Sequence, residues 1–182
     1  NSFLLESVEG KERIARYSFL GSRPNWVLTG YGRQIELLRR ANNDHMRALK
    51  YETNSDPLRE LESLMKPFKT PVIPELPRFY GGAVGYIGYD ISQFLENVPK
   101  HSNEALKLPD IVMMLAGCIV IFDHAKHTML LVANAIMPWR SPHAAYKKSI
   151  SLIHAMAERL THTSSASKAV SRHSLRKKRP RV

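Results

Sequence analysis

The feature that most constrains the fold is an uninterrupted apolar run, IVMMLAGCIVIF, at residues 111–122. The run is too short for a membrane-spanning helix, which needs about 18 to 20 such residues. A second apolar run occupies residues 128–136, and the polar segment DHAKH separates the two. Two apolar runs around a short polar segment are typical of a β-hairpin. We therefore predict an antiparallel hairpin over 111–136 that is buried on at least one face.

Other β-favouring stretches precede this hairpin. SFLLES at residues 2–7 and RYSFLG at 16–21 flank a charged segment that contains glycine, so we expect two strands joined by a turn. The stretch WVLTGYGRQIELLR at 26–39 predicts a strand, a turn and a strand. Gly30 and Gly32 are available there for the positive φ that a tight turn often needs.

Two helices are predicted from their start signals and apolar stripes. Asp56 is a candidate N-cap with Pro57 at the first helical position, and Ser141–Pro142 repeats this pattern. The first stripe consists of Leu58, Leu61, Leu64, Met65 and Phe68. The second consists of Tyr146, Ile150, Ile153, Ala157 and Leu160, which predicts a helix that ends near Leu160. ISQFLENV at 91–98 predicts a short helical segment.

Strands outnumber helices in this prediction and do not alternate regularly with them, so the fold class is α+β with a largely antiparallel sheet packed with helices. The chain carries a net charge of +11, and seven basic residues without any acid lie in 161–182, which leaves about +4 for the rest. We predict one domain over 1–161 and a basic, disordered tail over 162–182. The tail lacks aromatic residues for base stacking, so a nucleic-acid partner is not expected.

The single cysteine, Cys118, excludes an intrachain disulfide and fits a reducing compartment, so we expect a cytoplasmic protein without membrane association. Because Cys118 lies inside the apolar run, we interpret it as a buried small hydrophobe instead of a catalytic thiol.

No stretch predicts a self-contained active site. GGAVGY at 81–86 lacks the glycine spacing of a dinucleotide loop and the Gly-Lys of a P-loop. His124 and His127 lie three apart in a predicted turn without a third ligand nearby in sequence, which favours solvated side chains over a zinc site. We therefore predict no catalytic and no metal-ligating residue.

Four ordered stretches nevertheless carry a family resemblance: SFLLESVEGKERIARYSFLG, PRFYGGAVGYIGYD, LPDIVMML and VIFDHAKHTMLLVANA. Over residues 1–161 they resemble the N-terminal half of anthranilate synthase component I, of the chorismate-utilising enzymes. That family converts chorismate to anthranilate in tryptophan biosynthesis. The resemblance implies that the chain lacks the beginning of the N-terminal half and the whole catalytic half.

The same resemblance implies cofactors, partners and activity. The family's lyase activity uses Mg²⁺ and ammonia from a glutamine amidotransferase subunit, component II. The Mg²⁺ ligands and catalytic residues belong to the half that is not present here. We therefore expect this chain to be inactive alone and to bind no cofactor.

Feedback inhibition by L-tryptophan is the function that the resemblance places on this half. In the family, tryptophan binds the Leu-Glu-Ser motif, here Leu5, Glu6 and Ser7, and a polar residue on the next strand, which aligns near Arg16 and Tyr17. Such residues could supply an anion for the ammonium, a cation for the carboxylate and an apolar wall for the indole. Because the opposite wall lies in the catalytic half, tryptophan binding by this chain should be weak or absent.

Other interpretations remain open. The chain could be a fragment of aminodeoxychorismate synthase component I of the folate pathway, which differs in its product. It could instead be a non-enzymatic nucleic-acid-binding protein that uses its basic tail, or a relic without function.

Overall fold

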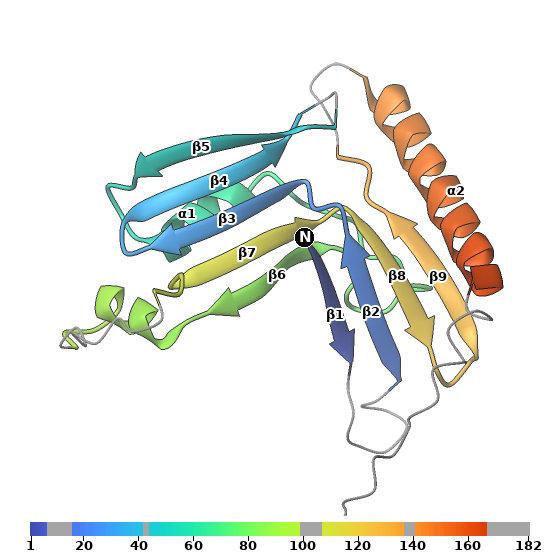
Figure 1. Cartoon of the computed structure of the whole chain (residues 1–182), viewed down its shortest axis with the longest axis horizontal. Coiled ribbons are helices and arrows are strands. Elements are labelled where there is room, and N and C mark those ends of the chain that lie inside the picture. Colours follow the sequence, from blue (N-terminus) through green and yellow to red (C-terminus); the bar gives the residue numbers. More distant parts are fainter. Residues whose placement is uncertain (7–15, 42–43, 99–106, 137–140, 167–182) are drawn as a thin grey trace, which may run out of the picture.

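A computed structural model describes residues 1–6, 16–41, 44–98, 107–136 and 141–166 (Figure 1). They form an α+β fold, as predicted. The strands are β1 (Ser2–Glu6), β2 (Tyr17–Ser22), β3 (Trp26–Tyr31), β4 (Gln34–Arg40), β5 (Met46–Glu52), β6 (Gly82–Ile87), β7 (Ile111–Ala116), β8 (Cys118–Asp123) and β9 (Thr128–Ala133). The helices are α1 (Pro57–Met65), the 3₁₀ helix η1 (Tyr89–Phe94) and α2 (Pro142–Ala166).

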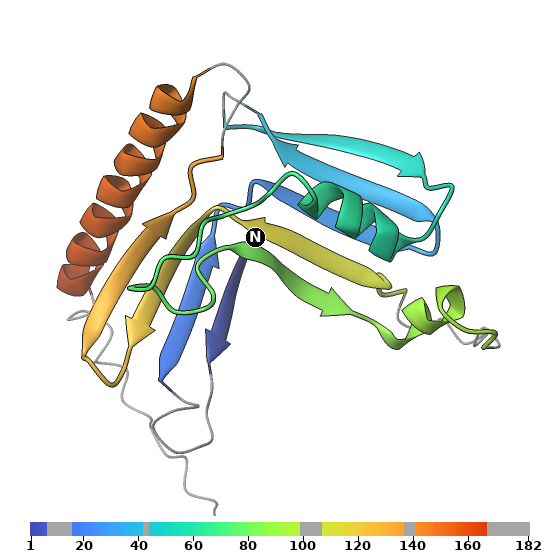
Figure 2. The same ribbon diagram turned by 180° about the vertical axis from the view of Figure 1, so that it is seen from behind.

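The strands form two antiparallel sheets instead of one. The smaller sheet has the order β1-β2-β8-β9, and the larger sheet has the order β5-β4-β3-β7-β6. Every neighbouring pair in either sheet is antiparallel. Figure 2 shows α1 lying across one face of the larger sheet, whereas α2 runs beside β9 of the smaller sheet.

The predicted hairpin is confirmed for β8 and β9, but its first arm does not include the whole apolar run at 111–122. The run divides at Gly117 into β7, which pairs with β3 and β6, and β8, which pairs with β2 and β9. Only β8 and β9 form the predicted hairpin. Gly117 lies at the transition, where a Cβ would meet the end of the Asn25 side chain, with Cγ at 3.1 Å. One sequence segment thus occupies a central position in both sheets.

The predicted first helix is confirmed as α1. The Asp56 carboxylate caps it by accepting hydrogen bonds from the backbone N–H groups of Leu58 and Arg59, both at 2.9 Å. Its apolar side covers the core of the larger sheet. That core contains the buried residues Trp26, Leu28, Ile35, Leu37 and Leu115, against which Leu61, Leu64, Met65 and Phe68 pack.

The second helix is also present, and it extends to Ala166, beyond the predicted end. Ile153, Ala157 and Leu160 of the predicted stripe are half-buried, but the first part of the stripe is shifted. Ala145 and Ser149 are buried, whereas Tyr146 and Ile150 are 61% and 37% exposed. Small side chains at the buried positions allow α2 to approach the smaller sheet closely, and the larger neighbours lie outside. The prediction favoured bulky apolar residues and therefore selected the adjacent face over this first part of the helix.

Two strands of the larger sheet, β5 and β6, were not predicted. β5 is an edge strand rich in charged residues, and most of its side chains are exposed, so it carries no apolar pattern. β6 coincides with the glycine-rich stretch that was compared with phosphate loops. A Cβ on Gly85 would collide with the Val112 carbonyl oxygen and lie 2.9 Å from Cα of Met113, so this glycine allows β6 to approach β7.

Of the two glycines expected to supply a positive φ in a turn, Gly32 does so and Gly30 does not. The β3–β4 hairpin pairs Tyr31 with Gln34, and Gly32 lies in the turn between them at φ +56°. Gly30 lies within β3 instead, where a Cβ would be 2.7 Å from Cγ2 of Ile111.

Candidate functional site at the end of the smaller sheet

The residues predicted to bind tryptophan lie at one end of the smaller sheet. In the β1–β2 register, Leu5 faces Phe19 and Glu6 faces Ser18 across the ladder, and Arg16 immediately precedes Tyr17 at the start of β2. Ser7 lies outside the described residues. Antiparallel pairing therefore brings the end of β1 and the start of β2 together at one end of the sheet.

The two strands direct these side chains to both faces of the sheet. Leu5 shares a face with Phe19 and Tyr17, whereas Glu6 shares the opposite face with Ser18, because side chains alternate along a strand. Leu5 is 42% exposed and Glu6 is also exposed. Since β1 is an edge strand, a small molecule at its end could contact side chains from both faces.

An aromatic layer lies on the Leu5 face. The rings of Phe19 and Phe79 meet edge to face with centroids 5.3 Å apart, and Phe3 meets Phe79 in the same way at 6.3 Å. The Tyr17 and Phe19 ring centroids are 6.0 Å apart. These rings pack on Ile119 and Ile121 of β8 and continue an apolar surface toward Tyr17.

Arg16 is held by a carboxylate that the sequence pattern did not single out. Its Nε donates to Oδ1 of Asp123 at 2.9 Å, and one terminal nitrogen donates to Oδ2 at 2.6 Å. The guanidinium also lies over the Tyr17 ring, 4.9 Å from its centroid. The hydrogen bonds to Asp123 raise the pKa of Arg16, and the same pairing lowers the pKa of Asp123 to about 2.

The pairing with Asp123 uses two of the three guanidinium nitrogens of Arg16. Asp123 is largely buried, with 5% of its side chain exposed, while 32% of the Arg16 side chain is exposed. The second terminal nitrogen of Arg16 makes no hydrogen bond to any residue in the described ranges. Asp123 therefore holds the Arg16 guanidinium in one orientation beside the Tyr17 ring. Its second terminal nitrogen is left without a partner among the described residues and could donate to a ligand.

His124 is not simply solvated in the β8–β9 turn. Its Nε2 lies 2.7 Å from Oγ of Ser18, which is 6% exposed, so the turn is joined to β2 on the face that Glu6 shares. His127 has φ 51° in the same turn. No group of three or more potential metal ligands occurs among the residues that the structure describes.

Sequence reasoning missed Asp123 and His124 as neighbours of the predicted residues. Asp123 is 107 residues from Arg16 in sequence, and only the pairing of β2 with β8 brings the two together. The available signal was an acid at the end of an apolar run, which is equally typical of a turn.

Cys118 is buried, with 4% exposure, as the sequence predicted. Burial raises the pKa of its thiol, so the thiolate is disfavoured. None of the helices in the described part of the chain is long and apolar enough to span a bilayer.

The two-sheet arrangement defines the class of protein. The fold matches anthranilate synthase component I from Streptococcus pneumoniae with a TM-score of 0.56 and 23% sequence identity, covering 85% of this chain and 31% of that one. The chain therefore has a fold that is found in anthranilate synthase component I. No protein-family model matches the sequence.

Sequence comparison identifies relatives of the chain in the same family. The chain is 36% identical over 132 residues to anthranilate synthase component 1 of Acetivibrio thermocellus, covering 72% of this chain and 26% of the relative. It is 33% identical over 164 residues to the protein of the same name from Pseudomonas aeruginosa, covering 88% and 31%. The chain is thus homologous to anthranilate synthase component 1, and it spans about a quarter to a third of these relatives' length.

Proposed function

We propose that this chain is the tryptophan-sensing part of an anthranilate synthase component I. The observation that carries the proposal is the homology over most of the chain, together with the position of Glu6 and Arg16 at one end of the smaller sheet. Tryptophan would act there as a feedback inhibitor of the complete enzyme, which would convert chorismate to anthranilate.

The chemistry of the strand ends suits a zwitterionic aromatic amino acid. Glu6 would accept hydrogen bonds from the ligand ammonium, and the remaining donor of Arg16 would bind the carboxylate, together with Ser7. Leu5 and Tyr17 would line the indole on the apolar face. The Asp123 pair supports this assignment because it holds Arg16 in one orientation, which lowers the entropy lost when a ligand binds.

Inhibition would be a coupling between this site and the site for chorismate. If tryptophan favours an arrangement that binds chorismate less well, chorismate must weaken tryptophan binding by the same factor. We place the chorismate site, the Mg²⁺ ligands and the catalytic groups in the part of the relatives that this chain does not span. The relatives' name, component 1, supports a complex with a second component, for which we propose a glutamine amidotransferase that supplies ammonia.

Two alternatives find no support in these observations. The relatives reported above are named anthranilate synthase, which gives no reason to prefer aminodeoxychorismate synthase. The basic tail at 162–182 lies outside the described residues from 167 onward, so its disorder and any binding to nucleic acid remain predictions from sequence.

The test is a titration of the isotopically labelled chain with L-tryptophan, followed by the chemical shifts of backbone amides. We expect weak binding, in the millimolar range, with shifts concentrated at Leu5, Glu6, Arg16 and Tyr17. Glu6→Gln should abolish these shifts because it removes the partner of the ammonium. Glu75→Gln, the same change on an exposed loop, is the matched control and should not alter them.

Shifts that occur away from the ends of β1 and β2, or that remain unchanged in Glu6→Gln, would contradict the assignment of the site. A chorismate-dependent appearance of anthranilate fluorescence with the purified chain would contradict the placement of the catalytic groups elsewhere.

A further inference from the structure

A cavity of about 630 Å³ lies away from the strand ends described above, between the larger sheet, α1 and α2. Its volume is within the range of small-molecule sites, about 300 to 1,000 Å³. The walls come from the start of β3, the end of β4, the end of α1, the segment after β9 and the first turns of α2. None of Leu5, Glu6, Arg16 and Tyr17 lines it.

The cavity is cationic. Arg39, Arg40 and Lys148 line it, and no aspartate or glutamate is among the lining residues. Arg40 already donates to backbone oxygens of Pro24 and Asp44 and to the Asp44 carboxylate at 3.1 Å. Arg39 and Lys148 form no ion pair with a carboxylate in the described ranges. Two cations are thus available to a ligand.

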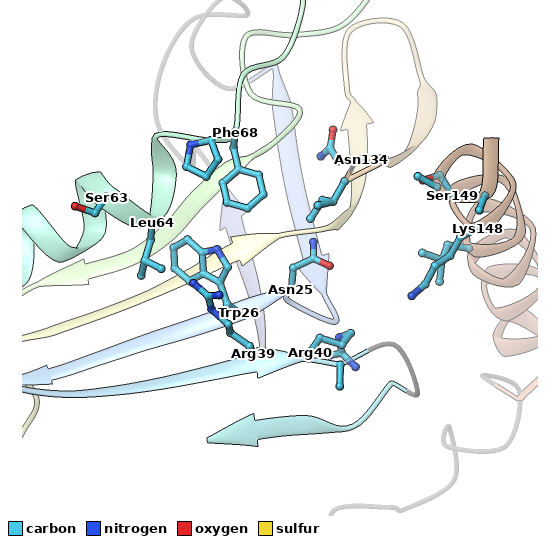
Figure 3. A pocket seen from close by; sticks show the side chains of 16 residues that line it. Asn25, Trp26, Arg39, Arg40, Ser63, Leu64, Phe68, Asn134, Lys148 and Ser149 are labelled. Carbon is cyan, nitrogen blue, oxygen red and sulfur yellow. The ribbon is translucent and has the colours of Figure 1, made fainter. Parts of the chain in front are cut away.

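These two cations lie on opposite walls. Arg39 projects from the end of β4 beside Trp26, while Lys148 projects from α2 toward the cavity from the other side (Figure 3). An apolar surface lies between them, formed by Trp26, Leu64, Phe68, Ile136 and Leu152. The cavity therefore combines an apolar surface with positive charges on two opposite walls.

Trp26 supplies a second, independent sign of an absent partner. Its indole is 4% exposed, and its Nε1 has no hydrogen-bond partner among the described residues. Leaving such a donor unsatisfied is unfavourable, and buried donors in native proteins are rarely left so. In Figure 3 the nitrogen lies on the side of the indole that faces Asn25 and Asn134. The nitrogen is covered in this structure, so an acceptor on a molecule in the cavity would satisfy it once the ring or a neighbouring side chain moves aside.

From this geometry we propose that the cavity binds a small ring-bearing organic anion with acidic groups at two ends. One acidic group pairs with Arg39 and the other with Lys148. The ring lies between them against Trp26 and Phe68, and oxygens of the ligand accept from the indole N–H and from the amide of Asn25.

The charge of the cavity excludes the ligand proposed for the strand ends. A free amino acid carries an ammonium group, which would lie here near three cations, and no carboxylate is among the lining residues to offset that repulsion. The two sites therefore favour ligands of different charge. Glu6 and Arg16 suit a zwitterion, and Arg39 and Lys148 suit an anion that lacks an ammonium.

The test uses terephthalate, a benzene ring with a carboxylate at each end, as the probe. The second tryptophan is first replaced by Trp139→Phe, so that the fluorescence of Trp26 alone is followed. We expect terephthalate to change this fluorescence with saturation. Arg39→Gln and Lys148→Gln should each weaken its affinity by about tenfold, as expected for one charge-assisted hydrogen bond. Lys126→Gln, in the exposed β8–β9 turn, is the matched loss of charge and should leave the affinity unchanged.

Two further ligands sharpen the result. Benzoate should bind more weakly than terephthalate and should lose affinity in only one of the two variants, since it carries one acidic group. L-phenylalanine should not compete with terephthalate. Equal affinity of terephthalate for the control, Arg39→Gln and Lys148→Gln would overturn the proposal, as would competition by L-phenylalanine. Because Glu6→Gln leaves this cavity intact, failure of the tryptophan site would not affect the terephthalate result.

Discussion

Replacement of Gly85 by alanine tests the close approach of β6 to β7. The new Cβ would meet backbone atoms of the neighbouring strand: the Val112 carbonyl oxygen, the Val112 carbonyl carbon at 2.8 Å and Cα of Met113 at 2.9 Å. Backbone atoms in the middle of a sheet cannot rotate away as a side chain can. The strands must therefore separate, and the ladder hydrogen bonds between β6 and β7 must lengthen.

The expected loss of stability combines the cost of the collision with the cost of the lengthened hydrogen bonds between β6 and β7. Overpacking in a well-packed interior costs about 1 to 3 kcal/mol, and the cost here should lie in the lower part of that range because Gly85 is exposed on β6, an edge strand that can move outward. Each weakened backbone hydrogen bond costs up to about 0.5 to 1.5 kcal/mol. A smaller opposing term comes from the lower entropy of the unfolded alanine chain, about 0.4 to 1 kcal/mol. We expect Gly85→Ala to lower the free energy of unfolding by about 1 to 3 kcal/mol in urea titrations.

Gly117→Ala is the matched comparison. The three atoms nearest to its Cβ would all belong to the end of the Asn25 side chain: Nδ2, which would collide, Cγ at 3.1 Å and Oδ1 at 3.3 Å. That side chain makes no hydrogen bond within the described residues and can rotate, so the loss should stay below about 1 kcal/mol. The argument from backbone contact fails if the two variants have equal unfolding free energies, or if Gly117→Ala is the less stable of the two.

Three further results are expected. Asp123→Asn should lower the free energy of unfolding at neutral pH. The difference in unfolding free energy from the wild type should be complete above pH 3.8, the ordinary pKa of the carboxyl. It should disappear as the pH falls through about 2, where Asp123 becomes protonated in the folded state. Urea midpoints measured at several pH values would show this. Asp56→Ala should cost about 1 kcal/mol by removing the cap of α1, measured by thermal melting with Asp56→Asn as the conservative control. Cys118 should not react with a thiol reagent in the native protein and should react fully in denaturant, and rapid native labelling would contradict its burial.

The elements that could be predicted from sequence were those with local signals. The Asp56–Pro57 start, the first two strands and the β3–β4 turn each depend on residues close in sequence, and the structure contains all of them. The two sheets could not be predicted, because the chain passes from one sheet to the other at Gly117, inside a continuous apolar run whose pattern shows no break. β5 was missed because its mostly exposed side chains follow no apolar period.

The candidate site divides in the same way. The family resemblance indicated Leu5, Glu6, Arg16 and Tyr17, and strand pairing places them at one end of the smaller sheet. Their role as tryptophan ligands remains a prediction. The carboxylate that holds Arg16 could not be found from sequence, since its position follows from long-range strand pairing.

The cavity had no sequence signal at all. Its lining residues come from five separated segments, and each of them has an ordinary local role in a strand, a helix or a loop. Only the tertiary arrangement shows that Arg39 and Lys148 line a common space.

The shared position of β7 and β8 also has a consequence for how the chain is made. Neither sheet is complete until this segment is available, because β3 lies between β4 and β7 and β2 lies between β1 and β8. Arg16 and its partner Asp123 are 107 residues apart, which at synthesis rates of about 5 to 20 residues per second is a delay of roughly 5 to 20 s. During that interval one hydrogen-bonding edge of β2 and one of β3 have no native neighbour. A nascent chain of this topology would fold late and would benefit from a chaperone at the ribosome exit.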